Sequence, residues 1–152
     1  MLLPERARLD DPEVVALTAA SVAELEVRYG GAPGSGDEPS DEDFLAPDGT
    51  FLLARLDGRP AGCGGISRID AATAEVRRMY VAPAERGRGA GRAMLGWLLE
   101  AARELGYLRV RLETGRRQPE ALRLYRTAGF RPIPCWGPFV KDPRSICMEL
   151  GL

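Results

Sequence analysis

A cluster of glycines near the middle of the chain places the strictest limit on what it can fold into. The cluster reads Arg86-Gly87-Arg88-Gly89-Ala90-Gly91 and lies between an expected strand at residues 74–81 and an expected amphipathic helix at residues 90–105. Backbone amides and the positive end of a helix dipole converge at such a turn, and both attract an anion. The cluster therefore predicts a phosphate site, while glycines that serve only a tight connection remain the alternative.

Two familiar nucleotide-binding patterns do not fit this cluster. A Rossmann fingerprint that starts at Gly87 requires a glycine where Arg92 stands, and one that starts at Gly89 requires it where Met94 stands. No Gly-Lys-Ser/Thr triplet ends the loop, so a P-loop is excluded as well. A phosphate held here must be bound in another way.

Hydrophobic spacing and turn residues predict the other elements. We expect one helix over residues 12–29, which a break could divide into two, and further elements at residues 50–56, 61–69, 107–112, 118–128, 130–133 and 145–150. An Asp57-Gly58 pair between the first two of these strands is a hairpin signal. Residues 30–47 are rich in Gly, Pro, Ser, Asp and Glu and predict a mobile acidic loop. This order predicts a mixed sheet with helices on its faces, in one domain over residues 1–152.

Histidine is absent from the 152 residues. A Ser-His-Asp triad, an imidazole base and a His-ligated zinc are therefore excluded. Any acid-base chemistry must use carboxylates, tyrosine, cysteine, arginine or the backbone, and we expect no metal.

The cysteines and the start of the chain bear on its location. Cys63, Cys135 and Cys147 are odd in number and far apart, so we expect reduced, buried packing residues. The chain has no apolar run of 18 residues, and its N-terminus lacks the pattern of a signal peptide. These features predict a cytoplasmic protein with no membrane partner.

Charge is divided unevenly along the sequence. Residues 1–50 hold 12 acidic and 3 basic residues, whereas residues 51–152 hold 18 basic and 10 acidic ones. Such a split favours an anionic ligand on one side of the protein and a neutral or cationic one on the other. The arginines alternate with apolar residues on expected helices and form no known nucleic-acid-binding pattern, so we expect no nucleic-acid partner.

The cluster also fits another pattern, Arg/Gln-x-x-Gly-x-Gly/Ala, at Arg86, Gly89 and Gly91. Here the chain resembles the GNAT superfamily of acetyl-CoA-dependent N-acyltransferases, and the resemblance covers roughly residues 50–135, including residues 74–81, 112–114, 121–125 and 129–130. It implies an α/β fold of mixed α+β type, with a mostly antiparallel sheet of six to seven strands that is splayed in the middle and flanked by about four helices. It also implies a single N-acetyltransferase domain.

Binding of acetyl-CoA is implied by the same resemblance. Backbone groups of β-strand residues would pair with the pantetheine arm, and amides of the glycine cluster would hold the pyrophosphate. The residues assigned to the coenzyme are Met79, Tyr80, Val81, Arg86, Gly87, Arg88, Gly89, Ala90, Gly91, Arg92, Gln118, Leu124 and Tyr125. Any of the arginine side chains could instead be solvated. Gln118 stands where many members have asparagine, so a coenzyme contact and a helix cap are both open.

Catalytic roles follow from the resemblance too. Glu75 is expected to remove a proton from the acceptor amine, through a water molecule, with Glu113 as the second choice for this role. Tyr125 is expected to protonate the coenzyme sulfur as it leaves. The N–H of Val81 or Met79 is expected to stabilise the oxyanion.

The acceptor is expected to be a small-molecule or peptide amine. Tyr29, Glu113 and Trp136 are expected to line its site, and the acidic residues 37–43 to attract its cationic amine, although these acids could be only a solubilising loop. A noncatalytic acyl-CoA-binding module of the same fold is the alternative function. Whether the chain forms a homodimer is left open.

Overall fold

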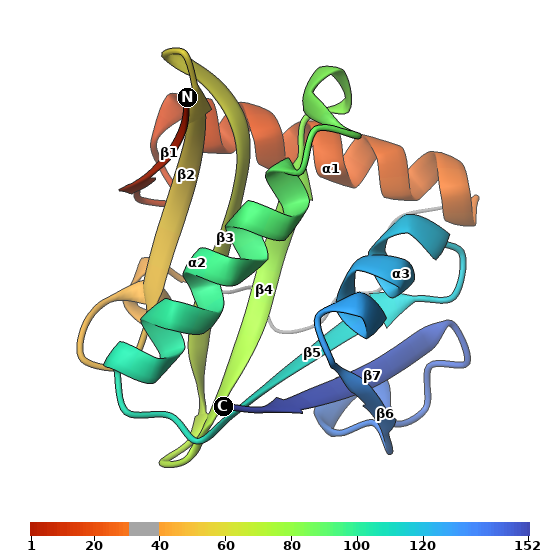
Figure 1. Cartoon of the computed structure of the whole chain (residues 1–152). Helices are drawn as coiled ribbons and strands as arrows, with labels where there is room; N and C mark the ends of the chain where they lie inside the picture. Colours follow the sequence, from red (N-terminus) through yellow and green to blue (C-terminus); the bar gives the residue numbers. More distant parts are fainter. Residues whose placement is uncertain (31–39) are drawn as a thin grey trace.

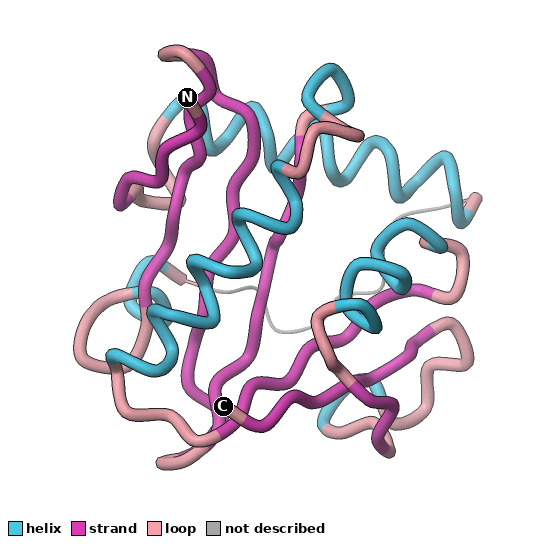
Figure 2. The backbone as a smooth tube through the Cα atoms, in the orientation of Figure 1, coloured by secondary structure: helices cyan, strands magenta, loops and turns pink. Residues whose placement is uncertain are grey.

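The computed structural model describes residues 1–30 and 40–152, in which ten helices and strands are linked by short connections (Figures 1 and 2). They are β1 (Leu2–Arg6), α1 (Pro12–Tyr29), β2 (Thr50–Leu56), β3 (Arg59–Asp70), β4 (Thr73–Val81), α2 (Ala90–Glu104), β5 (Arg109–Gly115), α3 (Pro119–Thr127), β6 (Arg131–Ile133) and β7 (Ser145–Gly151). Single turns of 3-10 helix lie at Asp41–Phe44, Pro83–Glu85 and Gly137–Phe139.

The strands form one sheet of seven in the order β1-β2-β3-β4-β5-β7-β6. Only β4 and β5 are parallel; every other pairing of neighbours is antiparallel. This arrangement confirms the expected mixed, mostly antiparallel sheet. The parallel pair is the one joined through α2, because two parallel strands need a crossover connection.

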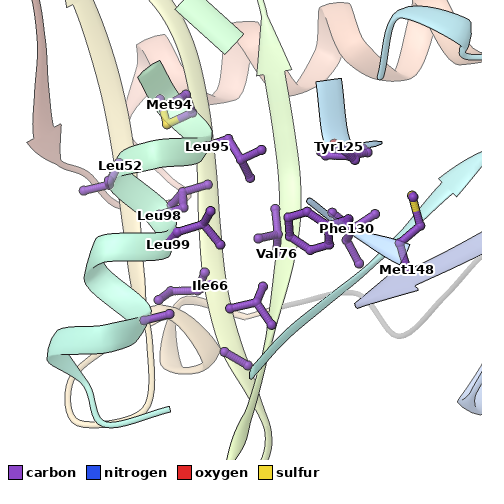
Figure 3. Close-up of a cluster of buried hydrophobic side chains, with 14 of the residues drawn as sticks. Leu52, Ile66, Val76, Met94, Leu95, Leu98, Leu99, Tyr125, Phe130 and Met148 are labelled. Carbon is purple, nitrogen blue, oxygen red and sulfur yellow. The ribbon is translucent and has the colours of Figure 1, made fainter. Parts of the chain in front are cut away.

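Helices cover both faces of the sheet. α2 and α3 lie over one face and α1 crosses the other, as Figure 1 shows. The main core lies under α2 and α3, where Leu98 and Ile66 are fully buried (Figure 3). A second cluster lies under α1 and contains Val14 and Leu17. Successive residues of β2 alternate between the two clusters, as the two-residue period of a strand requires.

Local signals account for the ends of several elements. Gly106, with φ of 91°, follows α2 in a left-handed conformation that favours glycine. Asp57 and Gly58, with φ of 51° and 82°, form the two-residue turn between β2 and β3. Positive φ at both central residues matches the twist of the two strands, and it confirms the hairpin predicted from this pair.

The structure differs from the expectations at three places. β1 was not expected; it is an edge strand that tolerates Pro4. Residues 1–30 and 40–152 contain three α-helices rather than about four, and α1 is one unbroken helix. The loop expected over residues 30–47 lies partly outside the described residues. Its described part contains a 3-10 turn that buries Phe44 against Phe51, with ring centres 5.2 Å apart.

Candidate active site

The parallel strands β4 and β5 separate soon after they meet. They pair only at Thr73–Arg109, Ala74–Val110 and Glu75–Arg111. Beyond Glu75 the two strands diverge and leave a wedge in the middle of the sheet, which Figure 1 shows between β4 and β5. The splay predicted for the sheet is confirmed.

A β-bulge in β4 lies at this wedge. Cys63 and Gly65 of β3 are two residues apart, but their partners Tyr80 and Arg77 are three apart, so β4 contains one extra residue. Arg78 adopts φ of 54°, which is uncommon for a residue other than glycine. A bulge bends its strand and redirects the side chains that follow. The second half of β4 is thereby turned away from the line of β5.

Backbone groups at the end of β4 face the wedge. The Ala82 N–H donates to the Ala61 carbonyl at 2.8 Å, and Val81 lies opposite Gly62. Hydrogen bonds alternate along an antiparallel pair, so the N–H and carbonyl of Val81 point away from β3. The carbonyl accepts a bond from Nε of Arg86 at 3.1 Å. The Val81 N–H therefore presents a donor to the wedge.

The glycine loop joins β4 to α2 in a left-handed conformation. Gly87 and Gly89 have φ of 77° and 82°, and a Cβ added at either would have no heavy atom within 4 Å. Gly89 is also the N-cap of α2, without a hydrogen bond from any side chain to the first turn. Amides at the start of α2, where Ala90, Gly91 and Arg92 lie, thus form an open site of the kind that binds phosphate.

Gly91 brings α2 close to the wedge. A Cβ at this position would lie 3.4 Å from Leu124 of α3 and 3.6 Å from Val81. Met79 lies 4.0 Å from the same point. Four residues expected to contact the coenzyme are thus brought together at one end of the wedge.

The arginine side chains of the loop have different surroundings. Nη2 of Arg86 lies 2.7 Å from Glu24 of α1, and its guanidinium carbon lies 5.4 Å from the centre of the Tyr80 ring. The Arg86 bond lowers the pKa of Glu24, despite the opposing effect of burial. Arg88 lies 3.8 Å from Glu85, whereas Arg92 is exposed on the first turn of α2. The charge of Arg86 is therefore already balanced within the protein.

Two half-buried carboxylates, Glu75 of β4 and Glu113 of β5, lie at the narrow end of the wedge. Glu75 is the last residue of β4 that pairs with β5, and Glu113 lies two residues beyond the last pair on β5. Burial raises the pKa of both carboxyls, and the charge of Glu113 raises that of Glu75 further, while Arg77 lowers it. The Ser145 hydroxyl donates to Glu113 at 3.2 Å. Carboxylates of raised pKa are suited to accept a proton near neutral pH.

Tyr125 approaches from α3 on the core side of the sheet. Its side chain is only 7% exposed and packs edge-to-face on Phe130, with ring centres 5.9 Å apart (Figure 3). Burial, with a smaller effect of the Glu113 charge, raises the pKa of the phenol to about 12. The hydroxyl is therefore protonated throughout the neutral range and can act only as a proton donor there.

Tyr29 ends α1 and reaches the tip of β5. Its hydroxyl accepts a hydrogen bond from the Arg117 N–H at 3.1 Å, and a Cβ on Gly115 would overlap that hydroxyl. The same Cβ would lie 3.0 Å from Nε2 of Gln118. Gln118 occupies the N-cap position of α3, as the helix-cap alternative expects, although its side chain makes no cap hydrogen bond.

The cysteine prediction is wrong for two of the three residues. Cys135 and Cys147 form a disulfide, while Cys63 is free and buried as expected. The spacing of the cysteines did not indicate this bond. β6 pairs with β7 in a register that places Ile133 opposite Cys147, so the chain beyond β6 passes directly over this cysteine.

Trp136 follows the disulfide and stands at the rim of β5. The guanidinium carbon of Arg111 lies 5.7 Å from the centre of its ring, and Phe139 packs edge-to-face on it at 5.6 Å. Arg111 is the partner of Glu75 in the β4–β5 register. Trp136 therefore lies on the same side of the wedge as the two carboxylates.

Two described acids of the acidic segment, Asp41 and Asp43, have structural partners. Asp41 accepts bonds from Arg8 at 3.1 Å and from the Leu9 N–H at 2.9 Å, and Asp43 accepts one from the Ser40 N–H at 2.8 Å. The Asp41 bonds fix the 3-10 turn to the connection between β1 and α1. The acids at residues 37 and 38 of this segment lie outside the described residues.

Several residues around the wedge were not singled out from the sequence. Arg117 and Arg144 lie in connections that show no motif, and Ser145 is the first residue of β7; they meet Tyr29 and Glu113 only in the fold. Within residues 1–30 and 40–152, no three His, Cys, Asp or Glu side chains converge as metal ligands would. None of the helices in these ranges is long and apolar enough to cross a membrane.

Comparisons with known proteins agree with this geometry. The model of the acetyltransferase (GNAT) family matches residues 19–130. An IAA acetyltransferase of Azospirillum brasilense is 40% identical over 107 residues, which are 70% of each chain. The N-alpha-acetyltransferase RimI of Mycobacterium tuberculosis is 36% identical over 64% of this chain and 65% of its own.

Solved structures match over the whole chain. A Klebsiella pneumoniae structure described as an acyl-CoA N-acyltransferase superimposes with a TM-score of 0.84 at 29% identity, over 100% of this chain and 98% of the other. The PaiA N-acetyltransferase of Thermoplasma acidophilum, solved with coenzyme A, gives 0.72 at 21% identity, over 100% and 99%. With the family model covering most of its length and the splayed sheet in place, this chain belongs to the acetyltransferase (GNAT) family.

Proposed function

We propose that the protein transfers the acetyl group of acetyl-CoA to a primary amine of a small-molecule or peptide acceptor, by direct attack in a ternary complex. The observation that carries this proposal is the wedge between β4 and β5, because it combines an open strand edge with Glu75 and Glu113. An enzyme needs both a place for the thioester and a base for the amine, and the wedge offers the two together.

The residues of the wedge fit the coenzyme. The Val81 N–H offers a strand-like partner for the pantetheine arm, and the open amides at the start of α2, where Gly91 lies, suit the pyrophosphate. Family structures solved with acetyl-CoA or coenzyme A support this assignment. Arg88 and Arg92 can add charge to the phosphate site, whereas Arg86 must first leave Glu24.

Acetyl transfer requires removal of a proton from the nitrogen, stabilisation of the oxyanion and protonation of the leaving sulfur. The acceptor attacks as an uncharged amine: its nitrogen forms a bond to the thioester carbonyl carbon, the nitrogen of the tetrahedral intermediate loses one proton, and the carbon–sulfur bond breaks to give an amide and a thiolate. Glu75, directly or through a water molecule, takes the proton, with Glu113 as the alternative base. Tyr125 gives its proton to the sulfur, and the N–H of Val81 stabilises the oxyanion of the intermediate.

Acceptor identity is the open part of this function. The relatives are named for different acceptors, one for IAA and one for N-alpha groups. The described surroundings of Glu113, with the aromatic rings of Tyr29 and Trp136, favour a small acceptor with an apolar body.

A thiol-release assay tests the proposal. Acetyl-CoA is supplied with a panel of amines, polyamines, amino acids, aminoglycosides and peptide N-termini, and coenzyme binding is measured separately by calorimetry. Turnover on at least one amine supports the proposal. Tight coenzyme binding without turnover on any acceptor supports the noncatalytic acyl-CoA-binding module instead.

A further inference from the structure

Tyr29 is flanked by two arginines that come from distant parts of the chain. The guanidinium carbons of Arg117 and Arg144 each lie 5.8 Å from the centre of its ring. Nη1 of Arg117 donates to the Arg28 carbonyl at 3.1 Å, and the Arg117 N–H donates to the Tyr29 hydroxyl. One guanidinium is thus fixed in orientation against an aromatic ring at the end of α1.

This arginine and tyrosine cluster borders the carboxylates of the wedge. Arg144 precedes Ser145, whose hydroxyl donates to Glu113, and the charge of Arg144 acts to lower the pKa of that carboxyl. Gly115, against which Tyr29 packs, lies two residues beyond Glu113 on β5. Two residues of strand span roughly 7 Å. The cluster therefore begins within the length of a small molecule from Glu113, the alternative base.

Arg117 differs from its neighbours in its charge balance. Arg144 is paired with Asp142 through two contacts of 3.0 and 3.1 Å, and Arg28 is paired with two glutamates at 3.2 Å. In the part of the chain that the structure describes, no carboxylate lies within ion-pair distance of Arg117. Its Nη1 is used by a neutral carbonyl, and its Nε and Nη2 remain as a pair of parallel donors.

We propose that the acceptor carries a carboxylate close to its amine, and that Arg117, held against Tyr29, binds this carboxylate; the inference rests on the proposed acetyl transfer. Two parallel N–H donors of a guanidinium match the two oxygens of a carboxylate. With the carboxylate on Arg117, the amine of an amino acid extends towards Glu113 and Glu75. The aromatic ring keeps the guanidinium plane in place, so little side-chain freedom is lost on binding.

Wild-type protein provides the first test. Free amino acids are compared as acceptors with their carboxamides in the thiol-release assay, and kcat/KM is expressed per uncharged amine, because a carboxamide lowers the basicity of its neighbouring amine. A charge-assisted bidentate contact predicts a preference of about 10- to 100-fold for the acid over the amide. Equal use of both forms overturns the inference.

Arg117→Gln provides the second test, with Arg116→Gln as its matched control. Both variants remove one positive charge, but Nε of Arg116 donates to the Pro143 carbonyl at 2.7 Å and its side chain has no contact with Tyr29. Arg117→Gln should raise the KM for the acid about 10- to 100-fold and leave the amide and the KM for acetyl-CoA unchanged. Arg116→Gln should keep the preference of the wild type.

The outcomes separate the two proposals. If amines without a carboxylate are acetylated as well as amino acids, acetyl transfer stands and the carboxylate site is refuted. If no acceptor is turned over, both proposals fail. Thermal unfolding of each variant shows whether a loss is one of folding, and Arg117→Lys, which keeps the charge but not the paired donors, should recover part of the preference. A loss in Arg117→Gln that is equal for acid and amide indicates a structural role and overturns the inference.

Discussion

Replacing Tyr125 by phenylalanine removes the proposed acid and keeps the packing of the ring. The ring contact with Phe130 at 5.9 Å stays, so the free energy of unfolding should change little. Loss of a general acid slows the chemical step by about 100- to 10,000-fold, which raises the barrier by about 3–5 kcal/mol. We expect kcat to fall by this factor in the thiol-release assay, while the affinity for acetyl-CoA, measured by calorimetry, stays within a factor of about two.

The buried position of Tyr125 adds a prediction about pH. With its pKa raised to about 12, roughly 1% of the phenol is ionised at pH 10, whereas an exposed tyrosine would be half ionised there. The rate of the wild type should therefore show no alkaline decline up to pH 10. A decline with a midpoint near pH 10 that is absent from Tyr125→Phe would refute the buried environment, and an unchanged kcat in that variant would remove Tyr125 from the acid role.

Tyr107→Phe is the matched control for this substitution. Tyr107 is as buried as Tyr125, but it precedes β5 at the end away from Glu113, and its hydroxyl donates to the Asp48 carbonyl. Removing that bond should cost about 1 kcal/mol of stability and leave kcat unchanged. Tyr125→Phe should thus lower kcat with little change in thermal stability, and Tyr107→Phe should lower thermal stability with no change in kcat.

Three further predictions concern the base, the disulfide and the packing of the sheet. Burial raises the pKa of Glu75, so the acid limb of the pH–rate profile should lie above the ordinary range for glutamate. Glu75→Gln should lose this limb. If the variant keeps the limb, another group is the base. Cys135→Ser removes a disulfide with a sequence separation of 12. Under oxidising conditions it should lower the free energy of unfolding by about 3 kcal/mol, or Tm by roughly 6–12 °C. An equal Tm for wild type and variant contradicts the disulfide. Gly65→Ala would place a Cβ 2.6 Å from the Phe51 ring and should destabilise by about 1–3 kcal/mol. Gly96→Ala, with no atom within 4 Å in α2, should stabilise by about 0.5–1 kcal/mol, and similar unfolding midpoints for both variants would argue against this packing.

Much of the fold could be predicted from local signals. The apolar spacing of α2, the Asp57-Gly58 turn and the glycines after helices act within a few residues, so they can be seen in the sequence. β1 was missed because a short edge strand with Pro4 has little alternation and is stabilised only by β2. The predictions of Glu75 and Tyr125 came from a resemblance over many residues, since each residue alone is typical of a strand or a helix core.

The contacts between distant segments could not be predicted in this way. Tyr29 and Arg117 are 88 residues apart, and Cys135 lies near Cys147 only because β6 and β7 pair in one register. Their contacts depend on the three-dimensional path of the chain, and no spacing in the sequence records that path. The acids of residues 41–43 were expected either to attract an amine or only to solubilise a loop, and composition alone could not show that Asp41 bonds to Arg8.

The short pairing of β4 with β5 also has a mechanical consequence. Three residue pairs join a half-sheet of β1 to β4 with a half-sheet of β5 to β7, so few backbone contacts hold these two halves of the sheet together. A strand-like ligand in the wedge would extend the joint with its own hydrogen bonds and with contacts to both halves. Such a ligand would stabilise the contact between the two half-sheets as well as take part in the reaction. The two half-sheets would then be harder to separate than in the free protein.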